Sequence, residues 1–333
     1  MFRSFFLTKR WMVWSFAGGA LILFATWYKV QLDVRINDWF GTFYNMIQGA
    51  LAKPGSITMG EYMSQLSTFA WVAGLYVLIA VLTDFFVKHY IFRWRNAMTD
   101  FYTQHWHVLR GIEGASQRVQ EDTARFARIM EDLGISFVRS VMTLMAFLPI
   151  LWSFSHQVKA LPWLGEVPQA LVWVAIVFAL CGTVLLALIG FKLPGLEFQN
   201  QRVEAAYRKE LVHGEDDHDR AAGPHLTSLF REVRRNYFRL FFHYMYFDVA
   251  KWSYLQIGVL VPYIALGPTL VAGGITLGIM QQIVRAFGRV EMSFQYLVNS
   301  WTTIIELISV YKRLRAFERT ITRKDNVGLA VAE

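Results

Sequence analysis

The sequence predicts an all-α integral membrane protein with about six transmembrane helices and long cytoplasmic extensions. Of its 333 residues, 55% are hydrophobic and only 17% are charged, which is more apolar than an ordinary soluble protein of this length. The apolar residues also gather in runs of about 20, the length that a helix needs to cross the core of a bilayer. Both observations favour membrane helices over six buried helices of a large soluble protein.

Six runs reach this length and are the expected transmembrane helices. Residues 11–30 follow Lys9 and Arg10, as in a signal peptide, but no small-residue cleavage site comes after them, so we expect a retained first helix. Residues 1–320 are predicted to form one transmembrane domain, with a short cytoplasmic tail at 321–333. The later spans are expected near 69–87, 135–154, 170–191, 241–266 and 270–310, the last only partly inside the membrane.

The connections between spans differ in their helix breakers. Residues 31–66, which contain Pro54 and Gly55, are expected to form an outer loop with a short amphipathic helix. The inner connections lack Gly and Pro over long stretches, so their helices should continue past the membrane surface, with a turn near Gly223.

The positive charge of the chain follows its topology. The net charge is +8, but alternate connecting segments carry 25 Lys and Arg residues on one side and 3 on the other. This distribution follows the positive-inside rule and places both termini in the cytoplasm. It argues for a multi-pass protein of the bilayer and against a nucleic-acid partner.

The last predicted span is unusually polar. Glu291, Gln295 and Asn299 lie four residues apart and therefore share one helix face. Charged groups at membrane depth are costly and usually face a cavity or a partner. These residues either line a solvent-filled cavity or are satisfied by neighbouring helices.

Carboxylates on the inner extensions suggest proton exchange. On an unbroken helix Glu197, Glu204 and Glu215 fall within about 20° of one another, whereas Glu121 and Glu131 are about 80° apart. Glutamates that line a low-dielectric cavity can exchange protons near neutral pH. The alternative is a set of surface ion pairs, since Glu204 and Arg208 have i, i+4 spacing, and spacing alone slightly favours that alternative.

Four longer runs carry a family resemblance. Glu113–Gly134, Lys192–Asp217, Asn236–Gln256 and Asn299–Glu318 resemble the SbmA/BacA peptide transporters of bacterial inner membranes. The first two runs are also distantly similar to the membrane domains of peroxisomal-type ABC half-transporters. The AGGITLG stretch, Ala272–Gly278, resembles ABC exporter membrane domains before their last helix.

This resemblance implies a fold and a function. The implied fold is an ABC-exporter-like membrane domain in a domain-intertwined homodimer, without an ATPase domain. The implied function is import of antimicrobial peptides and peptide-like antibiotics across the inner membrane, driven by the proton gradient and without a cofactor or enzymatic activity. Family members usually carry a further hydrophobic region ahead of the segment that matches residue 11 onward, so the helix count and substrate range stay open.

The resemblance also assigns residues. The proton-coupling glutamates of the family correspond to Glu121, Glu131, Glu204 and Glu215. Matching motifs place Arg118 and Phe147 near the transport cavity. Glu197, Glu291, Gln295 and Asn299 remain further cavity candidates on spacing alone.

Two other functions stay open. The sequence has no GxxxxGK followed by Ser or Thr, so it cannot form a P-loop of its own. A membrane subunit that recruits a separately encoded ATPase is the first alternative, because Glu210–Asp217 has the character of a coupling helix, although the resemblance speaks against such a partner. A non-transporting membrane scaffold or sensor is the second. His105 and His107 are too close in sequence to aim at one metal ion, so no metal site is expected.

Overall fold

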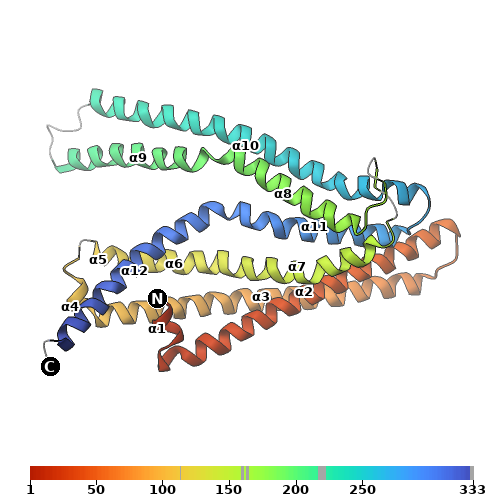
Figure 1. Ribbon diagram of the computed structural model, residues 1–333, viewed down its shortest axis with the longest axis horizontal. Coiled ribbons are helices and arrows are strands. Elements are labelled where there is room, and N and C mark those ends of the chain that lie inside the picture. Colours follow the sequence, from red (N-terminus) through yellow and green to blue (C-terminus); the bar gives the residue numbers. More distant parts are fainter. Residues whose placement is uncertain (113, 159–160, 163–164, 217–222, 331–333) are drawn as a thin grey trace. The chain divides into compact units, whose positions relative to one another are not determined.

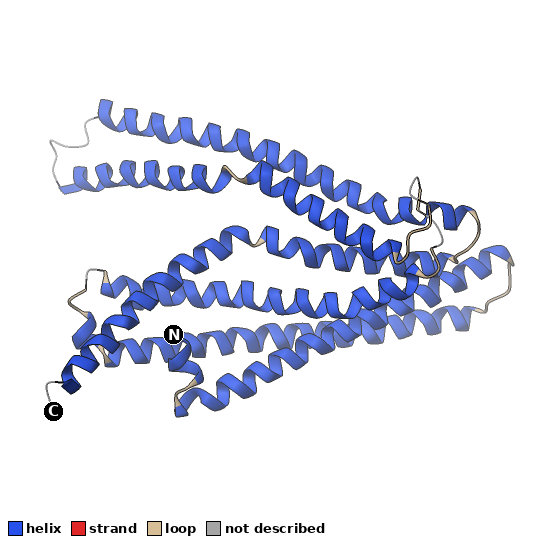
Figure 2. Ribbon diagram, in the orientation of Figure 1, coloured by secondary structure: helices blue, strands red, loops and turns tan. Residues whose placement is uncertain are grey.

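The computed structural model is built from helices and divides into two compact units (Figures 1 and 2). It describes residues 1–333 except 113, 159–160, 163–164, 217–222 and 331–333, and only the backbone of 216, 297–299, 301–302, 305 and 322–330. The first unit joins Met1–Ala175 to Ala265–Glu333, and the second is Ile176–Ile264.

The first unit begins with a short helix and two long ones, α1 (Phe2–Phe6), α2 (Lys9–Ala52) and α3 (Met59–Gln104). After α4 (Trp106–Leu109), a continuous helical run contains α5 (Ala115–Gln117), α6 (Thr123–Ile129) and α7 (Ile135–Ser155), joined by two π-helical turns, η1 (Arg118–Asp122) and η2 (Met130–Gly134). Near the end of the chain, α11 (Leu277–Asn299) packs against α7 and α2, and α12 (Trp301–Ala330) packs against α6 and α4.

The second unit is a helical hairpin. It contains most of α8 (Ala170–Gly190), all of α9 (Leu193–Asp216) and most of α10 (Gly223–Val271). Tyr254 of α10 lies directly over Gly182 of α8, where a β-carbon would overlap its ring, and Phe178 stacks on the same ring at 4.7 Å. Glycine at position 182 therefore sets the close approach of α8 and α10.

Five helical segments are long and apolar enough to cross a membrane, which confirms the multi-pass prediction. They are Lys9–Ala52, Met59–Gln104, Ala115–Ser155, Ala170–Glu215 and Gly223–Val271, and they contain the first five predicted spans. Within the described residues, the sixth predicted span, 270–310, does not qualify. A turn with Gly273 at φ 65° divides it, and charged side chains interrupt the apolar sequence of α11.

The structure agrees with one prediction about the connections between spans and contradicts another. Helices longer than a bilayer core are confirmed: α10, at 49 residues, is about 74 Å long, more than twice the roughly 30 Å core of a bilayer. That the extensions lie on the inner side stays a prediction. The predicted outer loop at 31–66 is wrong over most of its length, because α2 continues to Ala52. The helix ends at Ala52, and its cap residue Lys53 is extended because it directly precedes Pro54, where the α conformation is disfavoured.

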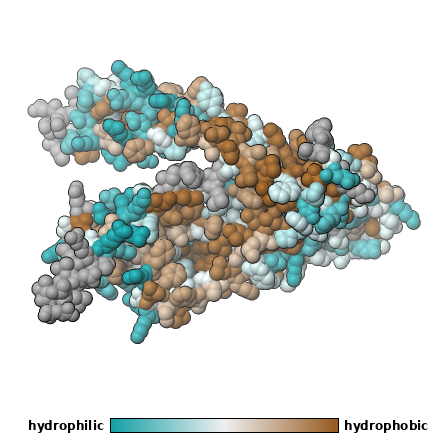
Figure 3. Space-filling model, viewed as in Figure 1, coloured by the Kyte–Doolittle hydropathy of each residue, from teal (hydrophilic) through white to brown (hydrophobic). Residues whose placement is uncertain are grey.

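The surface of the second unit changes character along its length. Figure 3 shows hydrophilic side chains over α9 and the first half of α10, and hydrophobic ones over α8 and the second half of α10. Large apolar side chains of α8 are exposed, among them Val177, Leu180, Val184 and Leu188. An exposed apolar surface of this kind is expected where a helix faces lipid.

The core of the first unit is rich in aromatic residues toward the ends of α3 and α12. Phe5, Trp94, Phe126 and Phe317 are almost completely buried there, together with Tyr102. Trp94 stacks on Phe5 at 5.8 Å and meets Phe126 edge to face at 5.4 Å. This cluster ties the first helix, the α6 segment and the last helix into one body.

Candidate functional site

Three of the predicted carboxylates lie on α9 in the second unit. The helix runs unbroken through Gly214, so Glu197, Glu204 and Glu215 share one face, as their spacing predicts. Glu197 and Glu204 are half-buried and Glu215 is exposed. Between α9 and α10 a different acid, Glu210, lies close to a histidine: its Oε1 is 3.9 Å from Nε2 of His225.

The surface ion pair expected from sequence spacing is not formed. Among the described residues, Glu204 has no ion pair with Arg208 or with any other basic side chain. Within the part of the chain that the structure describes, the half-buried carboxylate of Glu204 therefore has no ion-pair partner.

Glu121 and Glu131 lie in the two π-helical turns of the first unit. Glu121 belongs to η1 and is exposed, and Glu131 belongs to η2 and is half-buried. A π turn closes i to i+5 hydrogen bonds and inserts an extra residue, so the 80° separation expected for a regular α-helix does not apply. Such turns are frequent at functional sites, and here each carries one predicted proton-coupling residue.

Side chains from other helices hold both π turns in place. Arg95 of α3 donates to the Gln120 carbonyl oxygen at 3.4 Å, and the Tyr296 hydroxyl of α11 donates to the Leu133 carbonyl oxygen at 2.5 Å. The positions of Glu121 and Glu131 thus depend on α3 and α11.

A bidentate ion pair fixes η1 to the last helix. Arg313 of α12 donates from Nε to Asp122 Oδ2 at 2.9 Å and from Nη2 to Asp122 Oδ1 at 2.7 Å. These hydrogen bonds raise the pKa of the Arg313 guanidinium above its ordinary value. Asp122 is 5% exposed, whereas its neighbour Glu121 is exposed and accepts a hydrogen bond from Gln117 at 3.1 Å.

The two residues assigned near the cavity have different surroundings. The Arg118 guanidinium lies 5.6 Å from the centre of the Phe317 ring, so its cation is placed against α12. Phe147 is 1% exposed and belongs to a buried stripe of α7 with Thr143 and Leu151. A cavity role for either residue stays a prediction.

The polar residues of α11 are engaged by neighbours. Gln295 donates to Glu291 at 2.9 Å, and both side chains are buried. Arg289 donates to Asp33 of α2 at 2.7 Å. The contact of Arg289 with Asp33 fits the interpretation in which neighbouring helices satisfy α11, whereas the hydrogen bond from Gln295 to Glu291 lies within α11 itself. The side chain of Asn299 lies outside the described part of the chain.

Sequence analysis did not single out Asp33, Asp122 or Arg313. For Asp33 the sequence contained a signal, because an acid in the continuation of an apolar helix is unusual and needs a cationic partner. For Asp122 and Arg313 the sequence holds no such signal, since both lie among many charged residues of the inner segments.

Comparisons with known proteins agree with the family resemblance. A model of the SbmA/BacA-like family matches residues 8–322. The inner membrane ABC transporter ATP-binding protein YddA of Escherichia coli is 24% identical, over 87% of this chain and 54% of its own length. An ABC transporter ATP-binding protein of Synechocystis is 22% identical, over 96% and 48%. The chloroplastic ABC transporter D family member 2 of Arabidopsis thaliana is also 22% identical, over 90% and 41%. The chain spans about half the length of the curated relatives that it matches.

Proposed function

The chain belongs to the SbmA/BacA-like family, and we propose that it imports peptides and peptide-like antibiotics across the bacterial inner membrane, driven by the proton gradient. It is a membrane protein of a transporter family that is related to ABC transporter proteins. The substrate class, the direction of transport and the energy source are parts of the proposal.

The placement of the four glutamates carries this proposal. Glu204 and Glu215 lie on one face of α9, and Glu121 and Glu131 occupy π turns. Among the described residues, none of the four forms an ion pair with Lys or Arg, so protonation would change the charge of each position without competing against a salt bridge.

Such carboxylates can couple proton movement to a change of state. A ligand shifts a conformational equilibrium by its difference in affinity for the two states, and a proton acts as a ligand in this sense. Each proton that crosses the membrane contributes about 2.3 kcal/mol per 100 mV, so a few protons suffice for a large conformational change. In the proposed cycle a homodimer encloses the cavity and alternates between outward and inward states, and the glutamates load protons outside and release them inside.

Uptake of a fluorescent proline-rich peptide tests the proposal. Cells that lack their own carrier would express the protein, with and without a protonophore, at constant ATP. We expect the protonophore to abolish uptake, and Glu204→Gln and Glu121→Gln each to lower it about tenfold or more, because each removes a proton site. Glu210→Gln is the matched control on the same helix, since Glu210 already faces His225. Parental uptake by both correctly inserted variants would refute the role of the glutamates.

An ATP-driven transporter is the second candidate. The relatives are named as ABC transporter ATP-binding proteins, and this chain spans about half of their length. Uptake that resists the protonophore but falls on depletion of ATP would favour this candidate and a separate ATPase partner. Absence of uptake, with the protein present in the membrane, would favour a scaffold or sensor.

A further inference from the structure

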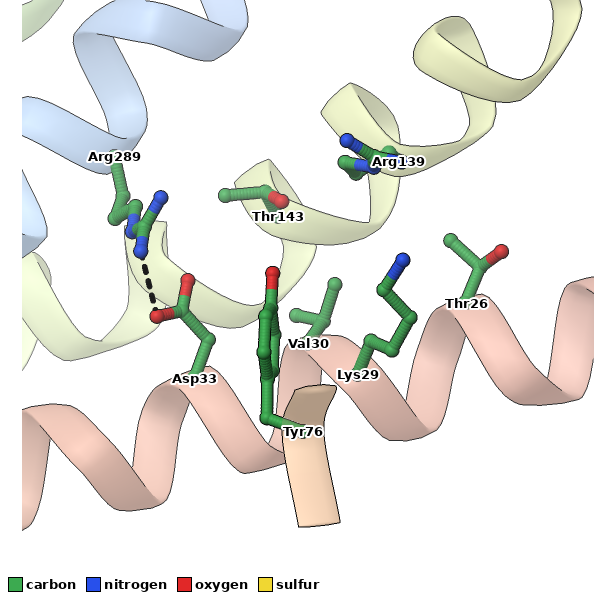
Figure 4. Close-up of a pocket in the computed structure, with 8 residues that line it drawn as sticks. All are labelled: Thr26, Lys29, Val30, Asp33, Tyr76, Arg139, Thr143 and Arg289. Carbon is green, nitrogen blue, oxygen red and sulfur yellow. Dashed lines mark hydrogen bonds and ion pairs between the residues drawn. The ribbon is translucent and has the colours of Figure 1, made fainter. Parts of the chain in front are cut away.

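A cationic pocket lies at mid-length of α2 in the first unit, apart from the four glutamates. Lys29 of α2, Arg139 of α7 and Arg289 of α11 line it, and Asp33 is the acidic residue among its lining side chains (Figure 4). The pocket has a volume of about 100 Å³. Water occupies about 30 Å³ per molecule in the liquid, so the pocket is large enough for one carboxylate or phosphate group.

The acid in the pocket is already engaged. Oδ1 of Asp33 accepts a hydrogen bond from Arg289 at 2.7 Å and lies 3.9 Å from Arg285. One carboxylate is thus shared between two guanidinium groups. The single negative charge of Asp33 is therefore outnumbered by the three cations that line the pocket.

Lys29 and Arg139 supply the uncompensated charge. Lys29 is 7% exposed, and among the described residues neither it nor Arg139 forms an ion pair. Arg139 repels the Lys29 ammonium electrostatically, and Asp84 of α3 attracts it. A buried cation inside a membrane helix without an ion-pair partner is costly, and a bound anion would lower that cost.

The remaining lining groups suit an oxyanion. Figure 4 shows the Lys29 ammonium and the Tyr76 hydroxyl pointing to the side of the pocket on which Arg139 and Thr143 lie. An ammonium group, a guanidinium group and hydroxyl groups are all hydrogen-bond donors, and a guanidinium group matches the two oxygens of a carboxylate or phosphate. We propose that this pocket binds a single carboxylate or phosphate group between Lys29 and Arg139.

Two sources of this group are chemically equivalent at the pocket. One is the phosphate of an anionic phospholipid. The other is the carboxyl terminus of a transported peptide, and this source rests on the proposed function. The pocket itself does not depend on that function, because its charge and volume belong to the first unit alone.

The test measures oxyanion binding by the full chain, purified in a neutral detergent. The first arm follows thermal unfolding in sodium phosphate or sodium acetate against sodium chloride of equal ionic strength. The second arm compares the affinity for one proline-rich peptide with a free carboxyl terminus and with a terminal amide. The third arm measures retention of phosphatidylglycerol by native mass spectrometry. The variants are Lys29→Met and Arg139→Gln. The control is Lys53→Met, which removes the same charge at the exposed end of the same helix.

We expect at least one oxyanion probe to bind the parent and Lys53→Met about tenfold or more tightly than Lys29→Met and Arg139→Gln, since a charge-assisted hydrogen bond is lost. A difference confined to the peptide acid would identify the substrate carboxylate, and one confined to phosphatidylglycerol would identify the lipid. If the variants bind all of the probes as the parent does, the pocket is not an oxyanion site. The first and third arms measure binding without transport. They therefore test the pocket even where peptide uptake fails and the proposed function is wrong.

Discussion

The helices inside the first compact unit are joined by other kinds of contact than the helices inside the second. In the first, polar groups far apart in sequence meet with defined geometry, as in the pairs Asp122–Arg313 and Asp33–Arg289. In the second, α8 and α10 meet through a tyrosine ring on a glycine, and α9 and α10 through the amide pair Asn200–Asn236 at 3.1 Å. The first unit therefore adds directional cross-links between helices to its buried aromatic core, whereas the helices of the second unit meet mainly through side-chain packing.

This difference bears on the proposed transport cycle. Regions with few directional contacts open or shift at lower free energy than regions with many. The π turns that carry Glu121 and Glu131 are fixed by α3, α11 and α12, whereas α9, with Glu204 and Glu215, is joined to α10 by a small set of contacts. The comparison predicts larger losses of stability in the first unit.

The largest loss is expected for Gly278→Ala in the first unit. A β-carbon there would overlap the backbone carbonyl oxygen of Gly41, which cannot rotate away, and α2 also supplies Asn45, which accepts from the Gly278 amide at 2.9 Å. We expect a destabilisation of about 3 kcal/mol, the upper end for overpacking. The readout is the midpoint of thermal unfolding of the purified protein in detergent.

The matched change in the second unit is Gly182→Ala. Here the overlap is with the side chain of Tyr254, so Tyr254→Leu should relieve it in the double variant. Asn45→Ala should not rescue Gly278→Ala in the same way, because the clash with the Gly41 backbone remains. Equal rescue in both units would contradict the contrast between them.

A smaller loss is expected for Asp122→Asn. The substitution weakens a bidentate pair with Arg313, whose side chain is 41% exposed, so we expect about 2 kcal/mol rather than the value for a fully buried pair. The control is Arg125→Gln, because its pair with Glu306 is exposed on both sides and should contribute less than about 0.5 kcal/mol. Similar midpoints for the two variants would show that the pair does not fix η1.

The smallest of these effects is expected in the second unit for Asn236→Leu. It leaves the buried amide of Asn200 without its donor, at a cost of about 1 kcal/mol. The double variant Asn200→Leu/Asn236→Leu should recover most of this loss, since two apolar groups then replace a hydrogen-bonded pair. Additive losses in thermal unfolding would mean that the amide pair contributes nothing as a pair.

Sequence patterns correctly predicted a helical membrane protein with long apolar helices, five of which the structure contains, because hydropathy and helix length are properties of consecutive residues. The same patterns missed the continuation of α2 to Ala52, because Gly41 and Gly49 lie within the helix and do not end it. They also missed the π turns: 100° periodicity assumes a regular helix, and the extra residue in each turn is stabilised by Arg95 and Tyr296 from other helices.

The amino-acid sequence by itself was enough to predict the long apolar helices, the common face of Glu197, Glu204 and Glu215, and the resemblance to the SbmA/BacA-like family. Packing between helices alone decided which charges are paired. Asp122 meets Arg313 across 191 positions and Asp33 meets Arg289 across 256, while Lys29 and Arg139 form no ion pair among the described residues. Spacing constrains neighbours within a turn or two of a helix, but a partner on another helix is set by where that helix docks.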